Sequence, residues 1–193
     1  TYDVEGKVVA TSSVDTVNAD DIERALQGFV GKIEQVPPMF SAVKRKGTPL
    51  YKLARKGVVV EREPKRIEIK SIEVLDIAMP DVVFNVECSR GTYIRTLCHD
   101  AGKALTCGGH LLDLRRTLSG VFTIDEAIGL NSDLETMRGA VIPVEAALGR
   151  IYKDIALSTE AADRVLRGAS MIGVEGAGQV SVGETVRLMG GAS

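Results

Sequence analysis

The hydrophobic positions along the chain alternate between helical and strand spacing. After Asn18, a favoured N-cap residue, apolar residues recur at i, i+3, i+4 and i+7, which predicts a helix over 18–29. Thr48 and Pro49 predict the start of a second helix that Gly57 ends. Further helices are predicted over about 92–105, ended by Gly108 and Gly109, and over 144–148 and 158–166.

Alternation of apolar and polar residues predicts strands between these helices. Ile67 and Ile69 alternate with charged residues, and the stretch 82–88 places Val82, Phe84, Val86 and Cys88 on one face. Shorter strands are expected at 58–60 and 119–124, and in the Gly- and Val-rich tail, 176–191. The alternating elements indicate a mixed α/β protein.

A change in composition at Pro143 suggests a domain boundary. After Pro143, two short helix-like segments lead to a tail over 176–191 that is rich in Gly and Val. We therefore expect one domain over 1–142 and a small β unit over 143–193.

Composition identifies the chain as an ordinary globular protein. Of its 193 residues, 45% are hydrophobic and 26% charged, which argues against a disordered chain. The longest run without a charged residue is nine, whereas a membrane-spanning helix needs about 20 apolar residues. No secretory pattern opens the sequence, and its first residue is Thr rather than Met, so we expect it to begin inside a longer protein.

The three cysteines show no Cys-x-x-Cys spacing, which favours reduced thiols and a cytoplasmic location. Cys98, His99, Cys107 and His110 could together supply zinc ligands. Adjacent ligands on a helix point about 100° apart, however, which suits a single metal poorly. Small buried thiols without a metal are the better interpretation.

Positive charge is concentrated in one segment of a nearly neutral chain. Ten of the 24 Lys and Arg residues lie between Lys44 and Lys70, opposed by three acidic residues, although the whole chain carries a formal charge of −2. Such a segment is typical of a surface that binds RNA or DNA. A solvated charged face is the alternative.

Two arginine clusters are the strongest candidates for chemistry. The first, CSRGTYIRT (88–96), lies where a strand ends and a helix begins, so Arg90, Arg95 and helix amides could hold an anion beside the aromatic ring of Tyr93. The second is LRRT (114–117). No hydrolytic triad, P-loop or dinucleotide motif is present. These residues indicate a cytosolic RNA-binding protein with an arginine-lined site.

Longer motifs carry a resemblance to a known family. QVPPMFSAVK (35–44), GTPLY (47–51), CSRGTYIRT (88–96) and GGHLLDLRRT (108–117) resemble the TruB family of bacterial tRNA pseudouridine synthases, and TYDVEGKV (1–8) is similar to the family's segment after its T-D-T signature. The resemblance implies an α+β fold with a pseudouridine-synthase-type sheet flanked by helices. It makes 1–142 the catalytic domain, lacking its N-terminal part, and 143–193 a PUA-like unit that looks short.

The resemblance also implies a reaction and assigns residues to it. The family flips the uridine at position 55 of the tRNA TΨC loop out of its stack, detaches the base and rejoins it through carbon. Tyr93 matches the substrate-contacting Tyr, Arg95 the Arg that pairs with the catalytic Asp, and Leu114 a Leu of the uracil pocket. A basic thumb over 38–64 would grip the T-arm of the tRNA through Lys44, Arg45, Lys46, Lys52, Arg55 and Lys56. No cofactor, metal, membrane or obligate protein partner is implied, and a monomer is the default expectation.

The family's nucleophilic Asp has no counterpart in this sequence. It belongs to a G-T-L-D-P-type motif upstream of the T-D-T signature, and no Asp here occurs in such a motif. We therefore expect this chain alone to be inactive as an isomerase. The alternative is a non-catalytic RNA-binding or RNA-chaperone protein on the same scaffold. Guide-RNA-dependent synthases are disfavoured by the thumb-like insertion.

Overall fold

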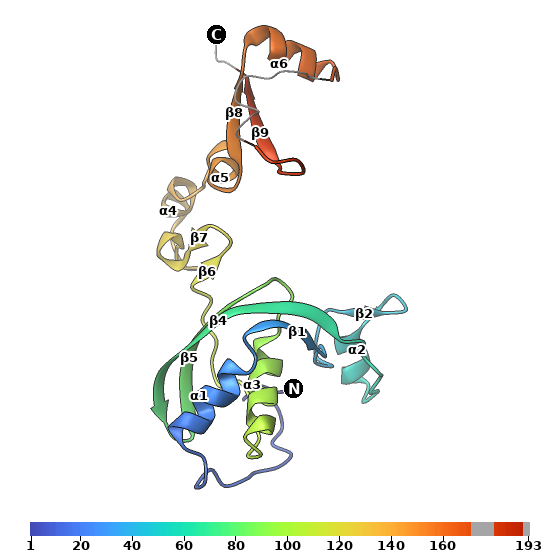
Figure 1. Cartoon of the computed structure of the whole chain (residues 1–193), viewed down its shortest axis with the longest axis vertical. Helices are drawn as coiled ribbons and strands as arrows, with labels where there is room; N and C mark the ends of the chain where they lie inside the picture. The colour runs from blue at the N-terminus through green and yellow to red at the C-terminus, as the bar shows by residue number, and fades with distance from the viewer. Residues whose placement is uncertain (171–179, 191–193) are drawn as a thin grey trace. The chain divides into compact units, whose positions relative to one another are not determined.

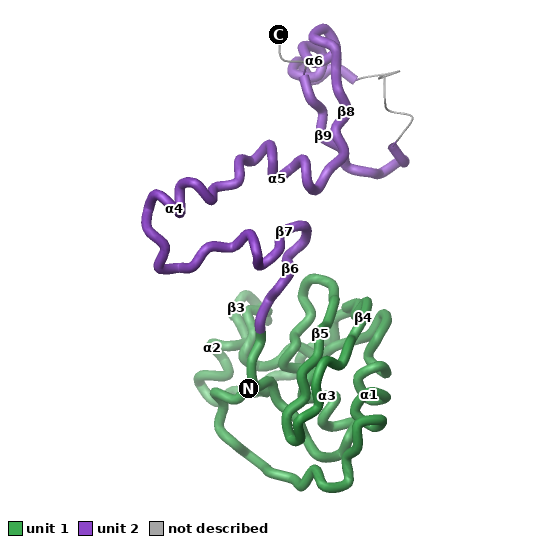
Figure 2. The backbone as a smooth tube through the Cα atoms, turned by 90° about the vertical axis from the view of Figure 1, so that its left-hand side faces the viewer, with its two compact units in different colours: residues 1–114 green, residues 115–193 purple. Residues whose placement is uncertain are grey.

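The computed structural model describes residues 1–170 and 180–190, and the chain divides into two compact units. Unit 1 comprises Thr1–Leu114 and unit 2 comprises Arg115–Ser193 (Figure 2). This division falls earlier than the boundary that composition predicts at 142–143. Residues 115–142 contain no buried side chain, so they add no core to unit 1.

Unit 1 is built on a three-stranded antiparallel sheet in the order β1-β4-β5. The strands are β1 (Gly31–Gln35), the long β4 (Lys65–Ala78) and β5 (Asp81–Cys88). Ile33 pairs with Ile67, and Ile72 with Val86. The strands predicted around 67–69 and over 82–88 are confirmed, whereas β1 was not predicted.

Helices α1 (Ala19–Gln27) and α3 (Ile94–Ala104) lie on the same side of this sheet (Figure 1). Asn18 caps α1 as predicted, because its side chain accepts a hydrogen bond from the amide of Asp21 at 2.9 Å. The core between helices and sheet consists of Ile22, Leu26, Ile67, Ile69, Ile72, Leu97 and Ala101. The mixed helix-and-sheet class is therefore confirmed.

The end of α3 differs from the prediction. The helix ends at Ala104, before the two glycines that were expected to end it. Those glycines instead pack against the helix, since a Cβ added at Gly102 would lie 2.2 Å from the backbone carbon of Gly108. The glycines thus permit close contact between two backbone segments.

The thumb, residues 38–64, contains a short hairpin followed by a short helix. β2 (Lys44–Arg45) pairs with β3 (Thr48–Pro49), and α2 (Leu50–Arg55) follows. Thr48 is therefore a strand residue, and Pro49 takes the N-cap position without a side-chain bond. Gly57 ends α2 as predicted, with a φ of +72°.

The strand predicted at 58–60 is absent. The amide of Val58 donates to the carbonyl of Leu53 at 3.0 Å, which completes the hydrogen bonding at the end of α2. Val59 is 77% exposed, so its β-branched side chain does not reflect a buried strand.

Unit 2 contains the remaining elements. They are β6 (Leu118–Ser119), β7 (Phe122–Thr123), the 3-10 helix η1 (Ile124–Glu126), α4 (Leu134–Gly139), α5 (Val144–Ile151), β8 (Lys153–Leu157), α6 (Thr159–Leu166) and β9 (Val186–Gly190). Strands β8 and β9 are parallel, and Ile155 and Leu157 of β8 are buried. Arg187 holds Asp154 through two hydrogen bonds of 2.6 Å.

The outcomes in unit 2 are mixed. Helices α5 and α6 confirm two predictions, while the strand expected over 119–124 is a hairpin that turns at Gly120 and continues into η1. In the tail, Val186–Gly190 forms β9, and the parts over 176–179 and at 191 lie outside the described residues. Within 1–170 and 180–190, no helix has the length and apolar character needed to cross a membrane.

Candidate active site

The first arginine cluster lies on the loop that joins β5 to α3. Ser89 extends the sheet, because its amide donates to the carbonyl of Glu68 at 2.8 Å and its hydroxyl accepts from the Glu68 amide at 2.9 Å. Gly91 then adopts a φ of +85°, which favours glycine, and the backbone turns. Tyr93 follows as the N-cap of α3. The predicted strand-to-helix junction is confirmed.

A buried glutamine holds this junction in place. The side-chain amide of Gln35 donates to the carbonyl of Tyr93 at 3.1 Å and accepts from the amide of Tyr93 at 2.8 Å. Gln35 is 3% exposed, so these two bonds satisfy polar groups that burial would otherwise leave unpaired. Its role was not predicted. The sequence did contain a sign of this role, because Gln35 is a polar residue on the same face of β1 as Ile33.

Arg95, in the first turn of α3, binds backbone carbonyls rather than a carboxylate. One guanidinium nitrogen donates to the carbonyl of Phe40 at 2.9 Å, and the other approaches that of Thr1 at 3.5 Å. Among the residues that the structure describes, Arg95 forms no ion pair. The guanidinium therefore retains donors that could bind an anion.

The start of the chain lies along the same face of α3. The ring of Tyr2 stacks on that of His99 with centroids 3.9 Å apart, and His99 follows Arg95 by one helical turn. Tyr2 also accepts a backbone hydrogen bond from Leu111 at 3.0 Å. Thr1 is thus held beside Arg95.

The Cys and His side chains considered as zinc ligands lie in other surroundings. Across residues 1–170 and 180–190, no three His, Cys, Asp or Glu side chains gather in a way that could hold a metal. Burial raises the pKa of the Cys98 thiol to about 11, which disfavours the thiolate that a metal requires. The Cys107 thiol faces the carbonyls of Gly102 and Gly108.

The six thumb cations are exposed and free of ion pairs within the described part of the chain. They are Lys44, Arg45, Lys46, Lys52, Arg55 and Lys56. By contrast, Lys70 on β4 binds Glu87 at 2.6 Å, and that contact raises the pKa of Lys70. Arg62 anchors the base of the thumb, because it donates to the carbonyl of the buried Pro37 at 3.1 Å. The thumb thus presents six unneutralised charges to solvent.

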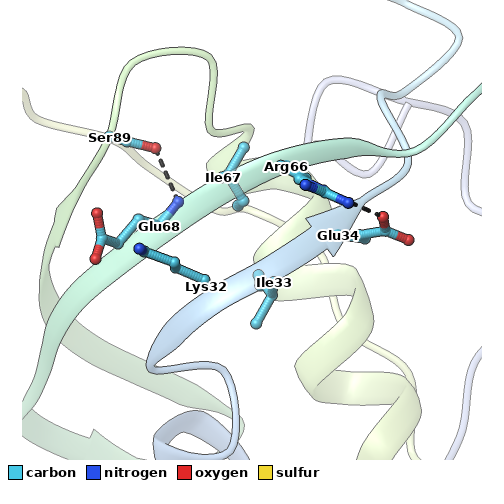
Figure 3. A pocket seen from close by; sticks show the side chains of 7 residues that line it. All are labelled: Lys32, Ile33, Glu34, Arg66, Ile67, Glu68 and Ser89. Atoms are coloured by element: carbon cyan, nitrogen blue, oxygen red, sulfur yellow. Dashed lines mark hydrogen bonds and ion pairs between the residues drawn. The ribbon is translucent and has the colours of Figure 1, made fainter.

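Two surface cavities differ in charge. One of about 450 Å³ lies over β1 and β4 and is lined by Lys32, Glu34, Arg66 and Glu68 together with Ile33, Ile67 and Ser89 (Figure 3). Its two acidic and two basic groups balance, so it offers no net attraction to a polyanion. The other, of about 530 Å³, lies in the thumb, where Arg45, Lys46 and one acidic residue, Glu61, border the apolar side chains of Leu53, Val59 and Val60. This second cavity combines positive charge with apolar surface.

The second arginine cluster lies at the division between the two units. Leu114 is the last residue of unit 1 and is 53% exposed, and its amide donates to the side chain of Asp113. Arg115 and Arg116 open unit 2 and are exposed. The structure therefore joins Tyr93 and Arg95 at one junction, while the place of Leu114 in a uracil pocket stays a prediction.

Comparison with solved structures identifies the class of protein. A Cbf5-Nop10-Gar1 complex contains a chain that is 30% identical with a TM-score of 0.64, over 90% of this chain and 52% of that one. An H/ACA RNP bound to a substrate RNA containing 2'-deoxyuridine matches at 25% identity with a TM-score of 0.64, over 93% and 53%. The model of the TruB family pseudouridylate synthase N-terminal domain matches residues 1–94. These matches give the chain the fold of the pseudouridylate synthases.

The particular family follows from the rest of the chain. Residues 95–149 match the tRNA pseudouridylate synthase B C-terminal domain. Proteins named tRNA pseudouridine synthase B are 45% identical over 89% of this chain in Clostridium kluyveri and 44% identical over 87% in Geotalea uraniireducens. The chain belongs to the TruB family. It spans 59% and 56% of the length of these two relatives.

Proposed function

We propose that this chain is the greater part of a tRNA pseudouridine synthase that isomerises the uridine at position 55 of the TΨC loop. Tyr93 would contact the flipped base, and Arg95 would pair with the nucleophilic carboxylate. Leu114 would line the uracil pocket. The observation that carries the proposal is the junction where Tyr93 caps α3 and Arg95 lies in the first turn of that helix. The relatives' names support tRNA as the substrate.

The surroundings of Arg95 support the idea that its carboxylate partner comes from outside residues 1–193. The guanidinium contacts two backbone carbonyls, which do not neutralise its charge, and one of them belongs to Thr1. In the family, the nucleophilic Asp precedes the segment that Thr1 begins. A segment with that Asp would connect to the chain at Thr1, which lies beside Arg95. That pairing would keep the carboxylate ionised and oriented for attack. This chain alone would then bind tRNA without forming pseudouridine.

The thumb supports the choice of a tRNA arm over a small anionic ligand. Six exposed cations without acidic partners in the described residues are suited to successive phosphates. The thumb cavity adds apolar surface beside Arg45 and Lys46, which is suited to unstacked bases of an RNA loop. We place the reaction in the cytoplasm, with a single subunit acting on one tRNA.

A chimera with its N-terminal part from a relative tests the assignment of Arg95. The residues that precede the matched region in the Clostridium kluyveri protein are fused to Thr1, and pseudouridine formation and tRNA affinity are measured. Arg95→Ala should abolish turnover and leave tRNA binding near that of the parent. Arg138→Ala, which changes an exposed arginine in the last turn of α4, is the control and should retain turnover. Loss of binding with turnover preserved would refute the role of Arg95.

The same assay separates the enzyme from a non-catalytic RNA-binding protein. If the chain from Thr1 to Ser193 binds tRNA and the chimera forms pseudouridine, the isomerase is supported. If both bind tRNA and neither modifies it, the RNA-binding or RNA-chaperone alternative is supported instead. Pseudouridine formed by the unfused chain would show that the nucleophile lies within these residues.

A further inference from the structure

Gln35 forms hydrogen bonds with both backbone polar groups of a single residue, Tyr93. The side-chain amide donates to the Tyr93 carbonyl and accepts from the Tyr93 amide, across 58 positions of sequence. A planar amide that contacts the N–H and the C=O of one residue restrains that residue's orientation about the chain axis. The direction in which the Tyr93 ring leaves the backbone is therefore tied to β1.

Tyr93 has few other restraints on its backbone. It is the N-cap of α3, with φ −100° and ψ 104°, and no side chain caps this helix. Its carbonyl accepts from the amides of Thr96 and Leu97 at 3.0 and 3.1 Å, which sets the helix start, but its own amide has Gln35 as its partner. Removing Gln35 would leave that amide without a protein partner near a buried strand end.

The segment that follows Gln35 also reaches Arg95. The chain passes through Pro37 and Pro38, both buried, to Phe40, whose carbonyl accepts from the Arg95 guanidinium at 2.9 Å. Residues 35–40 therefore contact both members of the candidate site and include the first residues of the thumb.

We infer that Gln35 is a positioning residue, which holds Tyr93 in the orientation that receives the flipped base. The inference rests on the proposed function and extends it to a residue that does not touch the RNA. Loss of Gln35 should weaken base flipping while the affinity supplied by the thumb is retained. A glutamine that served stability alone would not separate these two quantities.

The experiment compares two glutamines with the same kind of bond. Gln35→Leu removes the contact to Tyr93, and Gln27→Leu is the control, because the exposed Gln27 donates to the carbonyl of Ile72 at 2.9 Å away from the site. Each full chain is titrated with a T-arm stem-loop carrying 2-aminopurine beside the target uridine. Affinity reports binding, and the rise in fluorescence reports unstacking. Hydrogen exchange of the Tyr93 amide is followed in the free protein.

Gln35→Leu should lose most of the fluorescence rise and keep the parent affinity, with exchange of the Tyr93 amide faster by roughly tenfold. Gln27→Leu should resemble the parent in all three measurements. Equal behaviour of the two variants would overturn the inference, as would unchanged exchange at Tyr93. If the parent chain itself gives no binding or no fluorescence rise, the proposed base flipping fails. In that case, faster exchange of the Tyr93 amide in Gln35→Leu would show that Gln35 stabilises the fold only. The proposed role of Gln35 in RNA recognition would then be overturned as well.

Gln35→Glu keeps the test decisive if the Leu variant does not fold. Burial and the facing Tyr93 carbonyl should raise the pKa of the introduced carboxyl, because both disfavour its charged form. The neutral acid can donate to that carbonyl and accept from the Tyr93 amide, as Gln35 does. The fluorescence rise should therefore be near the parent's at low pH and decline as pH rises. A pH-independent response in this variant would contradict the positioning role.

Discussion

The salt dependence of RNA binding is the most quantitative consequence of the thumb. Its six exposed cations make no ion pairs in the described residues, so no acidic side chain neutralises them, although Arg45 also donates to the backbone carbonyl of Glu61. Six phosphate contacts give a slope of log K against log salt of about −4 to −5, or roughly a thousandfold loss of affinity between about 50 and 200 mM salt. Affinity for a T-arm stem-loop should fall accordingly.

The perturbation neutralises the β2–β3 hairpin without breaking its turn. Lys46 and Gly47 both have positive φ, at +47° and +81°, so Lys46→Asn is the change that this conformation tolerates. Combined with Lys44→Gln and Arg45→Gln, it removes three of the six charges. The magnitude of the slope should decrease by about 2 to 3.

Binding is measured by fluorescence anisotropy across a salt series. Neutralising three exposed cations elsewhere, Lys7, Lys103 and Arg138, provides a control with the same change in net charge. This control should keep most of the parent slope. If the hairpin variant retains the parent slope, or if the control loses as much, the thumb is not the RNA interface.

Three further predictions concern stability and reactivity. Gly102→Ala should destabilise unit 1 by about 1–3 kcal/mol, seen as a lower melting temperature, whereas Gly139→Ala, whose Cβ meets no atom within 4 Å, should not. Cys98 should be alkylated slowly at pH 8, with labelling rising toward its pKa of about 11; rapid labelling in the folded protein would contradict this burial. Arg187 lowers the pKa of Asp154, so this carboxylate stabilises unit 2 above its ordinary pKa, and the contribution is lost as pH falls through the lowered value. Asp154→Asn should therefore be less stable than the parent at neutral pH and equal to it in acid, as checked by denaturant unfolding; a constant difference would refute the linkage.

Elements with strong local patterns could be predicted from the sequence. The N-cap at Asn18 and the strand over 82–88 each depend on residues within one short segment, and both are confirmed. The β2–β3 hairpin was missed because a lysine rarely occupies the positive φ that its turn requires. The apolar run at 58–60 predicts a strand, but the amide of Val58 instead completes the hydrogen bonding at the end of α2.

The contacts within the candidate site were harder to predict than its residues. Tyr93 and Arg95 could be named from a motif, since only Ile94 separates them in the sequence. The partner of Tyr93 lies 58 positions away, and neither periodicity nor spacing carries information about such a pairing. Arg95 likewise binds carbonyls of Phe40 and Thr1, which have no side-chain signature. Tertiary structure alone brings these groups together.

Mapping the modified nucleotide tests the central claim most directly. The chimera described above is incubated with a complete tRNA transcript, and each uridine is examined for pseudouridine by carbodiimide modification and primer extension. We predict modification at position 55 of the TΨC loop, none when that uridine is replaced by cytidine, and none with the unfused chain. Pseudouridine at another position, or at position 55 with the unfused chain, would contradict the account.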